Sequence, residues 1–248
     1  EDSYGKTPEA WAKEKGHTEI VTLLQQHHTG TPQHQEGETK TSSKTNSKKK
    51  WNKKKKRNKK KHKQKKYMPL ALYKASDKGD VPKVKDLLSM EGVDVNEQSN
   101  AGWTPLMVAS IRNHVGVVEL LLQSTGLRVN QALGNGYTAL HVASESGCLK
   151  VMQLLLAKND IEINKATNDG YTALFFASQN NHVGVVEVIL SKSEIDINKA
   201  MKKGATALYI ASQKGQLEVV RLLLSKNDIN INKATKKGCT ALYIASQK

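Results

Sequence analysis

Short apolar clusters alternate with polar stretches along most of the chain. In a typical unit, Leu140 and Ala143 stand three residues apart, which places both on one face of a short helix. A second cluster follows, in which Val151, Leu154 and Leu155 repeat at i, i+3 and i+4, the pattern of an amphipathic helix. Isoleucines that alternate with polar residues come next. The pattern predicts two short helices and an extended turn.

This unit returns every 34 residues, with glycine, threonine, alanine and asparagine in fixed positions. A unit of this size cannot bury its apolar face alone, so successive units must stack into a solenoid. The recurring residues are Gly102, Gly136, Gly170, Gly204 and Gly238; Thr104, Thr138, Thr172, Thr206 and Thr240; Ala109, Ala143, Ala177, Ala211 and Ala245; Asn96, Asn130, Asn164, Asn198 and Asn232.

Each of these residue types has a physical reason for its position. Gly136 supplies the positive φ of a tight turn. Thr138 is a good N-cap for the first helix, and Pro105 in another unit stands at the first helical position, where a missing N–H costs nothing. The small Ala143 lets a neighbouring helix approach closely.

The unit resembles the ankyrin repeat. Its Thr-Pro-Leu-His-x-Ala pattern is matched by Thr138-Ala-Leu-His141-Val-Ala143 and, with Met107 in the histidine position, by 104–109. The period is 34, against about 33 in that family. The resemblance implies an all-α solenoid with short β-turn fingers, in which the histidine ties neighbouring loops together. Aromatic packing is expected to substitute for it at Phe175, Tyr209 and Tyr243.

The repeat frame divides the chain into three parts. Residues 67–248 form the main array, with an opening unit over 68–100 and a last unit that stops after its first helix. Residues 1–26 hold a lone unit with the same spacings, which we interpret as the end of an earlier array in a longer protein. On its own this unit should fray unless it docks elsewhere, and the last unit should expose an apolar face.

Residues 27–66 are a polar linker that carries the charge. The chain of 248 residues has a net charge of +16, and 16 of its 39 Lys and Arg lie between 40 and 66. No acidic residue lies between Glu38 and Asp77. The linker has little to bury and repels itself, so disorder is expected.

Dense lysine clusters in this linker suggest a nuclear import signal that an import receptor reads. Non-specific binding to the phosphates of RNA or DNA is the next interpretation, and a solvated spacer is the simplest. The chain is expected inside the cell, in the nucleus or the cytoplasm. The residues are Lys48, Lys49, Lys50, Lys53, Lys54, Lys55, Lys56, Arg57, Lys59, Lys60 and Lys61.

The turn tips recur at the same position in each repeat, but their residues differ from repeat to repeat. Exposed loops that vary in this way can give a surface its specificity. In proteins similar to this one, the fingers and the first-helix surface contact protein partners. Aromatic tips give way to lysine pairs along the array, so the C-terminal half is expected to favour an acidic partner. The predicted protein-binding residues are Trp103, Ile111, Arg112, Asn135, Tyr137, Glu145, Asn168, Asp169, Tyr171, Gln179, Lys202, Lys203, Gln213, Lys236 and Lys237.

No motif in the sequence predicts a catalytic or metal-binding site. Cys148 and Cys239 have neither disulfide-framework nor metal-ligand spacing. Cys148 and His141 share a unit, but no further catalytic partner accompanies them. The apolar runs are too short to span a membrane. We therefore expect no catalytic residue, cofactor, metal or small-molecule substrate.

The sequence thus predicts a non-catalytic scaffold or adaptor that binds other proteins. Two alternatives stay open. The chain could be a nucleic-acid-associated protein that uses 40–66, or the substrate-recruiting part of a larger enzyme whose catalytic domain lies outside it.

Overall fold

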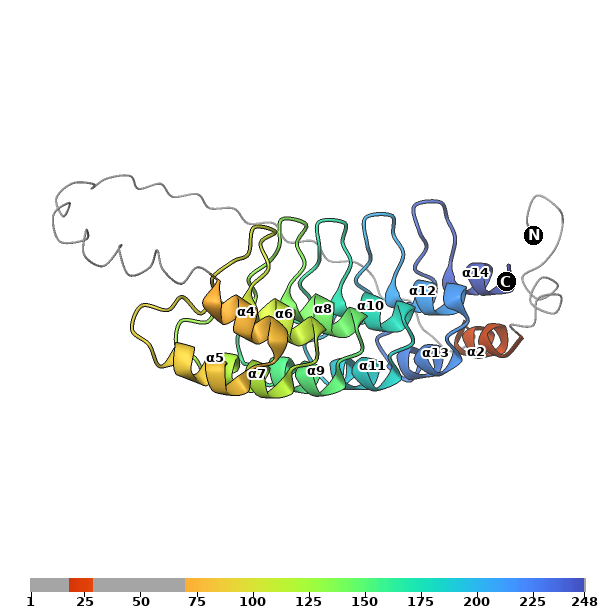
Figure 1. Cartoon of the computed structure of the whole chain (residues 1–248). Helices are drawn as coiled ribbons and strands as arrows, with labels where there is room; N and C mark the ends of the chain where they lie inside the picture. Colours follow the sequence, from red (N-terminus) through yellow and green to blue (C-terminus); the bar gives the residue numbers. More distant parts are fainter. Residues whose placement is uncertain (1–17, 29–69, 248) are drawn as a thin grey trace.

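The computed structural model describes residues 18–28 and 70–247, which fold into two rows of helices with long loops projecting from one row (Figure 1). The all-α solenoid predicted from the sequence is confirmed. First helices form the row that carries the loops: α4 (Ala71–Lys78), α6 (Pro105–Ile111), α8 (Ala139–Glu145), α10 (Ala173–Gln179), α12 (Ala207–Lys214) and α14 (Ala241–Ser246). Second helices form the other row: α5 (Val81–Leu88), α7 (Val115–Leu122), α9 (Leu149–Leu156), α11 (Val183–Leu190), α13 (Leu217–Leu224) and, at its end, α2 (Thr18–His28).

First helices begin where the sequence predicts. The Thr172 hydroxyl accepts a hydrogen bond from the backbone N–H of Phe175 at 3.2 Å, and the repeat threonines of α6, α12 and α14 do the same in their own helices. The opening helix α4 lacks this threonine. There the Glu97 carboxylate reaches from the next loop and accepts from the N–H groups of Leu70 and Tyr73, at 3.2 and 2.7 Å. A negative charge at this end also suits the helix dipole.

The core runs between the two rows. The repeat alanines Ala143 and Ala177 are fully buried where successive first helices pack together. On the second helices, Val151 and Leu155 are equally buried, as the i, i+4 spacing predicts. Truncating a buried leucine such as Leu155 to alanine should lower the free energy of unfolding by about 2–5 kcal/mol. Because the apolar positions recur in every unit, the core is one continuous cluster along the array.

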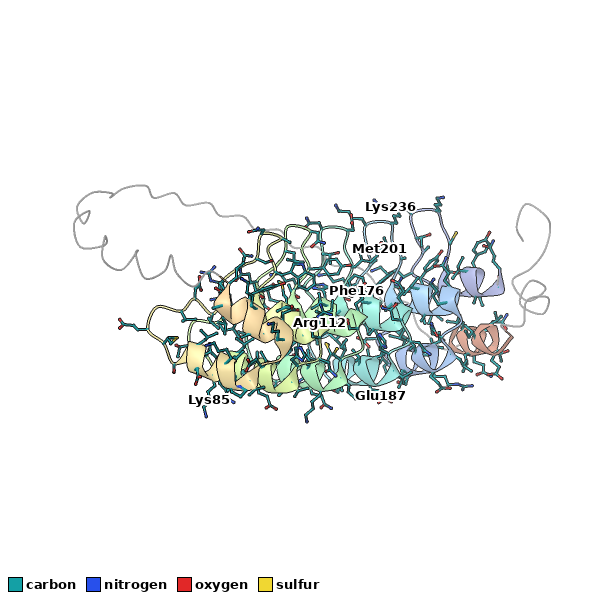
Figure 2. All side chains as sticks on the ribbon, viewed as in Figure 1. Lys85, Arg112, Phe176, Glu187, Met201 and Lys236 are labelled. Carbon is teal, nitrogen blue, oxygen red and sulfur yellow. The ribbon has the colours of Figure 1, made fainter. Side chains whose placement is uncertain are left out.

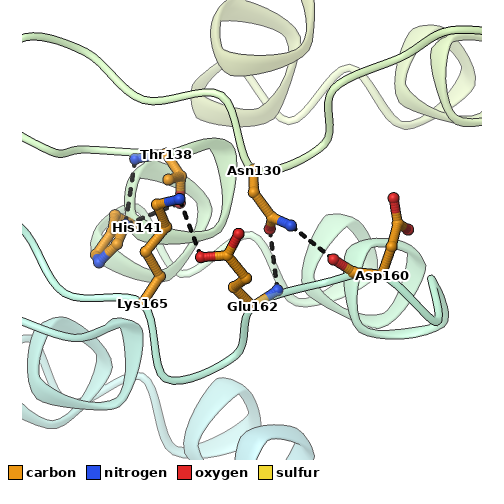
Figure 3. A network of polar contacts seen from close by, with 6 residues as sticks. All are labelled: Asn130, Thr138, His141, Asp160, Glu162 and Lys165. Carbon is orange, nitrogen blue, oxygen red and sulfur yellow. Dashed lines mark hydrogen bonds and ion pairs between the residues drawn. The ribbon is translucent and has the colours of Figure 1, made fainter. Parts of the chain in front are cut away.

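Asparagine side chains form hydrogen bonds between the loops that follow successive second helices. The Asn130 side chain donates to the carbonyl of Asp160 at 2.6 Å and accepts from the N–H of Glu162 at 3.0 Å (Figure 3). The bonds cross from one repeat to the next, 30 and 32 residues further on. The same pair of bonds is made by Asn96, Asn164 and Asn198. Four of the five asparagines in the series found in the sequence, all except Asn232, therefore tie one repeat to the next in the described structure.

Helix α2 precedes the array in the chain but packs at its far end, against α13 and α14 (Figure 1). Ile20, Val21 and Leu24 are buried there and belong to the same core cluster as the array. Glu19 lies 3.7 Å from Arg221 of α13. The apolar face that the sequence led us to expect as exposed is therefore covered, because α2 has the apolar spacing of a second helix and lies where one would follow α14.

The first helix expected for the lone unit lies outside the described residues, as does most of the predicted linker. The boundaries at 26 and 66 therefore stay predictions.

Candidate functional site

The loops that project from the first helices are tight hairpins. We call them fingers and name each by its tip glycine, from Gly102 to Gly238. In the Gly170 finger, the Thr167 N–H donates to the carbonyl of Tyr171 at 2.9 Å, and Gly170 donates back to Thr167 at 2.8 Å. Gly170 has a φ of 89°, a conformation that favours glycine. The same turn recurs in every finger, so the tips share one geometry.

Neighbouring fingers are tied by backbone hydrogen bonds. Asn168 N donates to Asn135 O at 2.9 Å, Lys202 N to Asp169 O at 2.8 Å, and Lys236 N to Lys203 O at 2.9 Å. A Cβ on the glycine of one finger would lie within 2.7–2.8 Å of the next backbone at Gly136, Gly170 and Gly204. These glycines thus permit close stacking. From the Gly136 finger onward the tips form one ladder.

Aromatic rings fill the base of the middle fingers. Tyr137 and Tyr171 lie 5.2 and 5.5 Å from Phe176, and Tyr171 lies 5.0 Å from Phe175, measured between ring centroids. Both tyrosines are half-buried, while both phenylalanines are buried. Phe175 stands in the histidine position of its repeat, and its ring contacts match the aromatic substitution expected there.

His141 is the histidine that matches the family pattern. It forms a capping box with Thr138 (Figure 3). Its Nε2 lies 3.2 Å from the carbonyl oxygen of Tyr171 in the next finger. Desolvation by burial lowers its pKa to about 4, although the hydrogen bond to Tyr171 opposes this shift. A histidine held neutral in this way stabilises the finger and is unsuited to be a general base near neutral pH.

The predicted partner residues fall into two rows. Trp103, Asn135, Tyr137, Asn168, Asp169, Tyr171, Lys202, Lys203, Lys236 and Lys237 lie on the fingers, and Ile111, Arg112, Glu145, Gln179 and Gln213 lie at the C-terminal ends of first helices. A first helix of seven residues separates the rows by about 10 Å. Neither row has a buried member, so both are accessible to a partner.

Two histidines that the sequence analysis did not single out connect neighbouring repeats. His114 and His182 each place Nε2 3.0 Å from a carbonyl of the preceding repeat, that of Asp77 and of Glu145. Their rings lie against Gly79 and Gly147, where an added Cβ would come within 2.7 and 2.5 Å of the ring. The sequence contains a sign of this contact: His114 and His182 are 68 residues apart, and so are Gly79 and Gly147. Two repeat interfaces therefore carry a histidine contact, and at a third the side chain of Gln216 lies 3.5 Å from the equivalent carbonyl, that of Gln179.

The environment of Cys148 does not activate it as a nucleophile. Cys148 is buried, and desolvation raises the pKa of its thiol, which disfavours the nucleophilic thiolate. No group of three metal-ligating side chains occurs among residues 18–28 and 70–247. In the same part of the chain no helix is long and apolar enough to cross a bilayer. The lysines predicted for import or nucleic-acid binding lie outside the described residues.

This architecture defines a class of helical-repeat proteins whose fingers and paired helices stack in one direction. The family model for ankyrin repeats, in three copies, matches residues 72–167, 131–201 and 196–248. The chain belongs to the ankyrin repeat family. Ankyrin repeats are generally protein–protein interaction modules and are typically non-catalytic. A comparison with curated proteins found no match.

Proposed function

We propose that this chain is a non-catalytic scaffold that binds partner proteins through its fingers and the C-terminal ends of its first helices. One observation carries the proposal. Backbone hydrogen bonds join the Gly136, Gly170, Gly204 and Gly238 fingers, so tips with different side chains are presented at a fixed spacing. A surface ordered before binding loses less conformational entropy when a partner docks.

The two rows of residues have different parts in this proposal. At the finger bases, Tyr137 and Tyr171 supply rigid, half-buried aromatic surface, the kind that is enriched at binding hot spots. At the helix ends, Glu145 and Arg112 supply exposed charges that select a partner and speed its encounter. The opposite edge carries the second helices, which hold Lys85 and Glu187 (Figure 2). It provides a control surface.

The test compares charge reversals on the two sides. The full chain and its variants are immobilised, and proteins captured from a cell extract are identified and their affinities measured. Glu145→Arg with Asp169→Arg should weaken a captured partner by about tenfold or more. Glu119→Arg with Glu187→Arg makes the same charge change on exposed second-helix residues and should leave affinity unchanged. Equal losses from the two pairs would contradict this surface.

A second function is favoured by the 16 basic residues of 40–66. We propose that this segment acts independently of the fingers, as an import signal or a phosphate-binding tether for nucleic acid. Deleting 40–66 should abolish nuclear accumulation of a fluorescent fusion, or retention on RNA at low salt, while partner capture persists. If the chain that lacks 40–66 still accumulates in the nucleus and is still retained on RNA, the segment is a spacer.

A further inference from the structure

Lysine pairs occupy the tips of the last two fingers. Lys202 and Lys203 stand on the Gly204 finger, and Lys236 and Lys237 on the Gly238 finger; all four are exposed. Figure 2 shows Lys236 at the outer edge of the fingers, away from the helices. None of the four is in an ion pair with another described residue. Their charges are free for a partner.

The two lysine-bearing fingers contain no acidic residue, and Asp169 on the preceding finger forms no ion pair with the described lysines. No Asp or Glu occurs in 197–217 or in 229–248, the two segments that contain these fingers and their first helices. The acidic residues of this half, such as Glu218 and Asp228, lie on a second helix or in the loop after it. Positive charge is therefore concentrated on the finger edge.

The two lysine pairs are held in register. Lys236 N donates to Lys203 O at 2.9 Å, which joins one pair to the other through the backbone, and Lys202 N is joined to Asp169 of the preceding finger at 2.8 Å. The backbone positions are thus fixed while the lysine side chains remain free to turn toward a ligand. An ordered array of like charges binds an opposite array with less loss of entropy than a disordered one.

We propose that the tips of the Gly204 and Gly238 fingers bind a run of acidic residues in a partner protein. This inference rests on the proposed protein-binding function and names the partner chemistry at one end of the surface. The chain's own segment 40–66 has the same sign of charge, so it is excluded as the occupant.

A nucleic acid fits this patch less well than a peptide. Fingers that carry aromatic residues beside the tip glycine, such as Trp103 and Tyr171, have no lysine pair, and the lysine-bearing fingers have Ala205 and Cys239 there instead. Base stacking needs aromatic side chains, and base reading favours arginine. Acidic side chains need only the point charges that lysine supplies.

The experiment uses the full chain with every lysine and arginine of 40–66 replaced by glutamine, so that the linker does not bind the probe. A fluorescein-labelled oligoglutamate peptide is titrated at low ionic strength. Lys→Gln at 202, 203, 236 and 237 should weaken binding by about tenfold or more, because several ion pairs are lost together. The control replaces the exposed Lys74, Lys83, Lys85 and Lys150 by glutamine, an equal charge change far along the array or on a second helix. It should retain most of the affinity.

Each outcome decides the matter. Equal losses in the finger and control variants would overturn the site, and so would binding that does not weaken with added salt. Tighter binding of a single-stranded oligouridylate of equal charge, lost in the finger variant, would assign the patch to nucleic acid. If a protein partner is captured through Glu145 and Asp169 but is unaffected by the finger lysines, this inference fails while the proposed function stands.

Discussion

The Asn130 side chain accepts a hydrogen bond from the backbone N–H of Glu162 at 3.0 Å, 32 residues further along the chain. It also donates to the carbonyl of Asp160 at 2.6 Å, so one amide satisfies two backbone groups of the next repeat. We predict that Asn130→Ala lowers the free energy of unfolding by about 1–3 kcal/mol, since two hydrogen bonds are lost. Urea denaturation of the full chain measures the change.

Asn232 provides the matched control for this prediction. It occupies the same repeat position, but among the described residues its side chain makes no hydrogen bond to a following loop. Asn232→Ala should therefore change stability by no more than about 0.5 kcal/mol. Similar losses at both positions would mean that the asparagine acts within its own loop and not between repeats.

The buried serines of the first helices should differ from one another. Ser144 donates to the carbonyl of Ala173 in the next repeat at 2.6 Å, while the equally buried Ser178 hydroxyl has no hydrogen-bond partner. Ser144→Ala should cost about 1 kcal/mol, and Ser178→Ala should be neutral or stabilising because it removes an unsatisfied polar group. Thermal or urea unfolding compares the two. A larger cost at Ser178 would contradict the assignment.

The sequence predicts the positions of the helices and their caps well, because these depend on residues close together in the chain. The spacing of Leu140 and Ala143 in one helix, and of Val151 and Leu155 in the next, depends only on helix periodicity, and the caps depend on residues three apart. The ties between repeats depend on partners 30 or more residues away. Nothing in the local sequence of His182 indicates that its ring meets a carbonyl of Glu145, and only the recurrence at 68 residues could have suggested it.

The same reasoning applies to the candidate surface. Repeat alignment identifies which residues stand on finger tips, since the glycines fix the turn. It does not reveal that the Gly136 finger and those after it share a backbone ladder. In the part of the chain that the structure describes, the Gly102 tip has no such bond to the Gly136 finger, and the nearest atom to a Cβ added at Gly102 is in the Leu133 side chain at 3.5 Å.

Protonation of His141 should destabilise the array at acid pH. Its pKa is about 4 in the folded chain and 6.5 in the unfolded chain, so the unfolded state binds the proton first as pH falls. The stabilisation is complete above about pH 6.5 and is lost between about 6.5 and 4, by about 3 kcal/mol in total. Urea unfolding across this range measures the loss.

His141→Met separates this effect from other titrations. Methionine stands in the same position of another repeat as Met107, where it is buried, so the substitution suits the fold. The variant should be less stable at pH 7, because it lacks the Thr138 bond, and should show a smaller decline toward pH 4. If the variant and the unaltered chain lose stability in parallel, the pKa of His141 is not the cause.

Substitution of Gly147 should disrupt the contact between this glycine and the ring of His182 in the next repeat. Its φ is 69°, and an added Cβ would lie 2.5 Å from the His182 ring. Gly147→Ala should cost at least about 2 kcal/mol, whereas Gly126→Ala, with a φ of 74° and open space, should cost only about 1 kcal/mol from backbone strain. Adding His182→Ala to Gly147→Ala should recover the steric part of the loss. Strictly additive costs would exclude a clash.

Docking of α2 should protect the end of the array. Leu24 is buried against the core, so Leu24→Asp places a charge there and should release the helix. Amide hydrogen exchange should then accelerate in α14 and remain unchanged in α8, which lies three repeats away. The control is Glu19→Gln, because the exposed ion pair to Arg221 at 3.7 Å contributes little. Equal protection of α14 in both variants would show that its stability does not depend on residues 18–28.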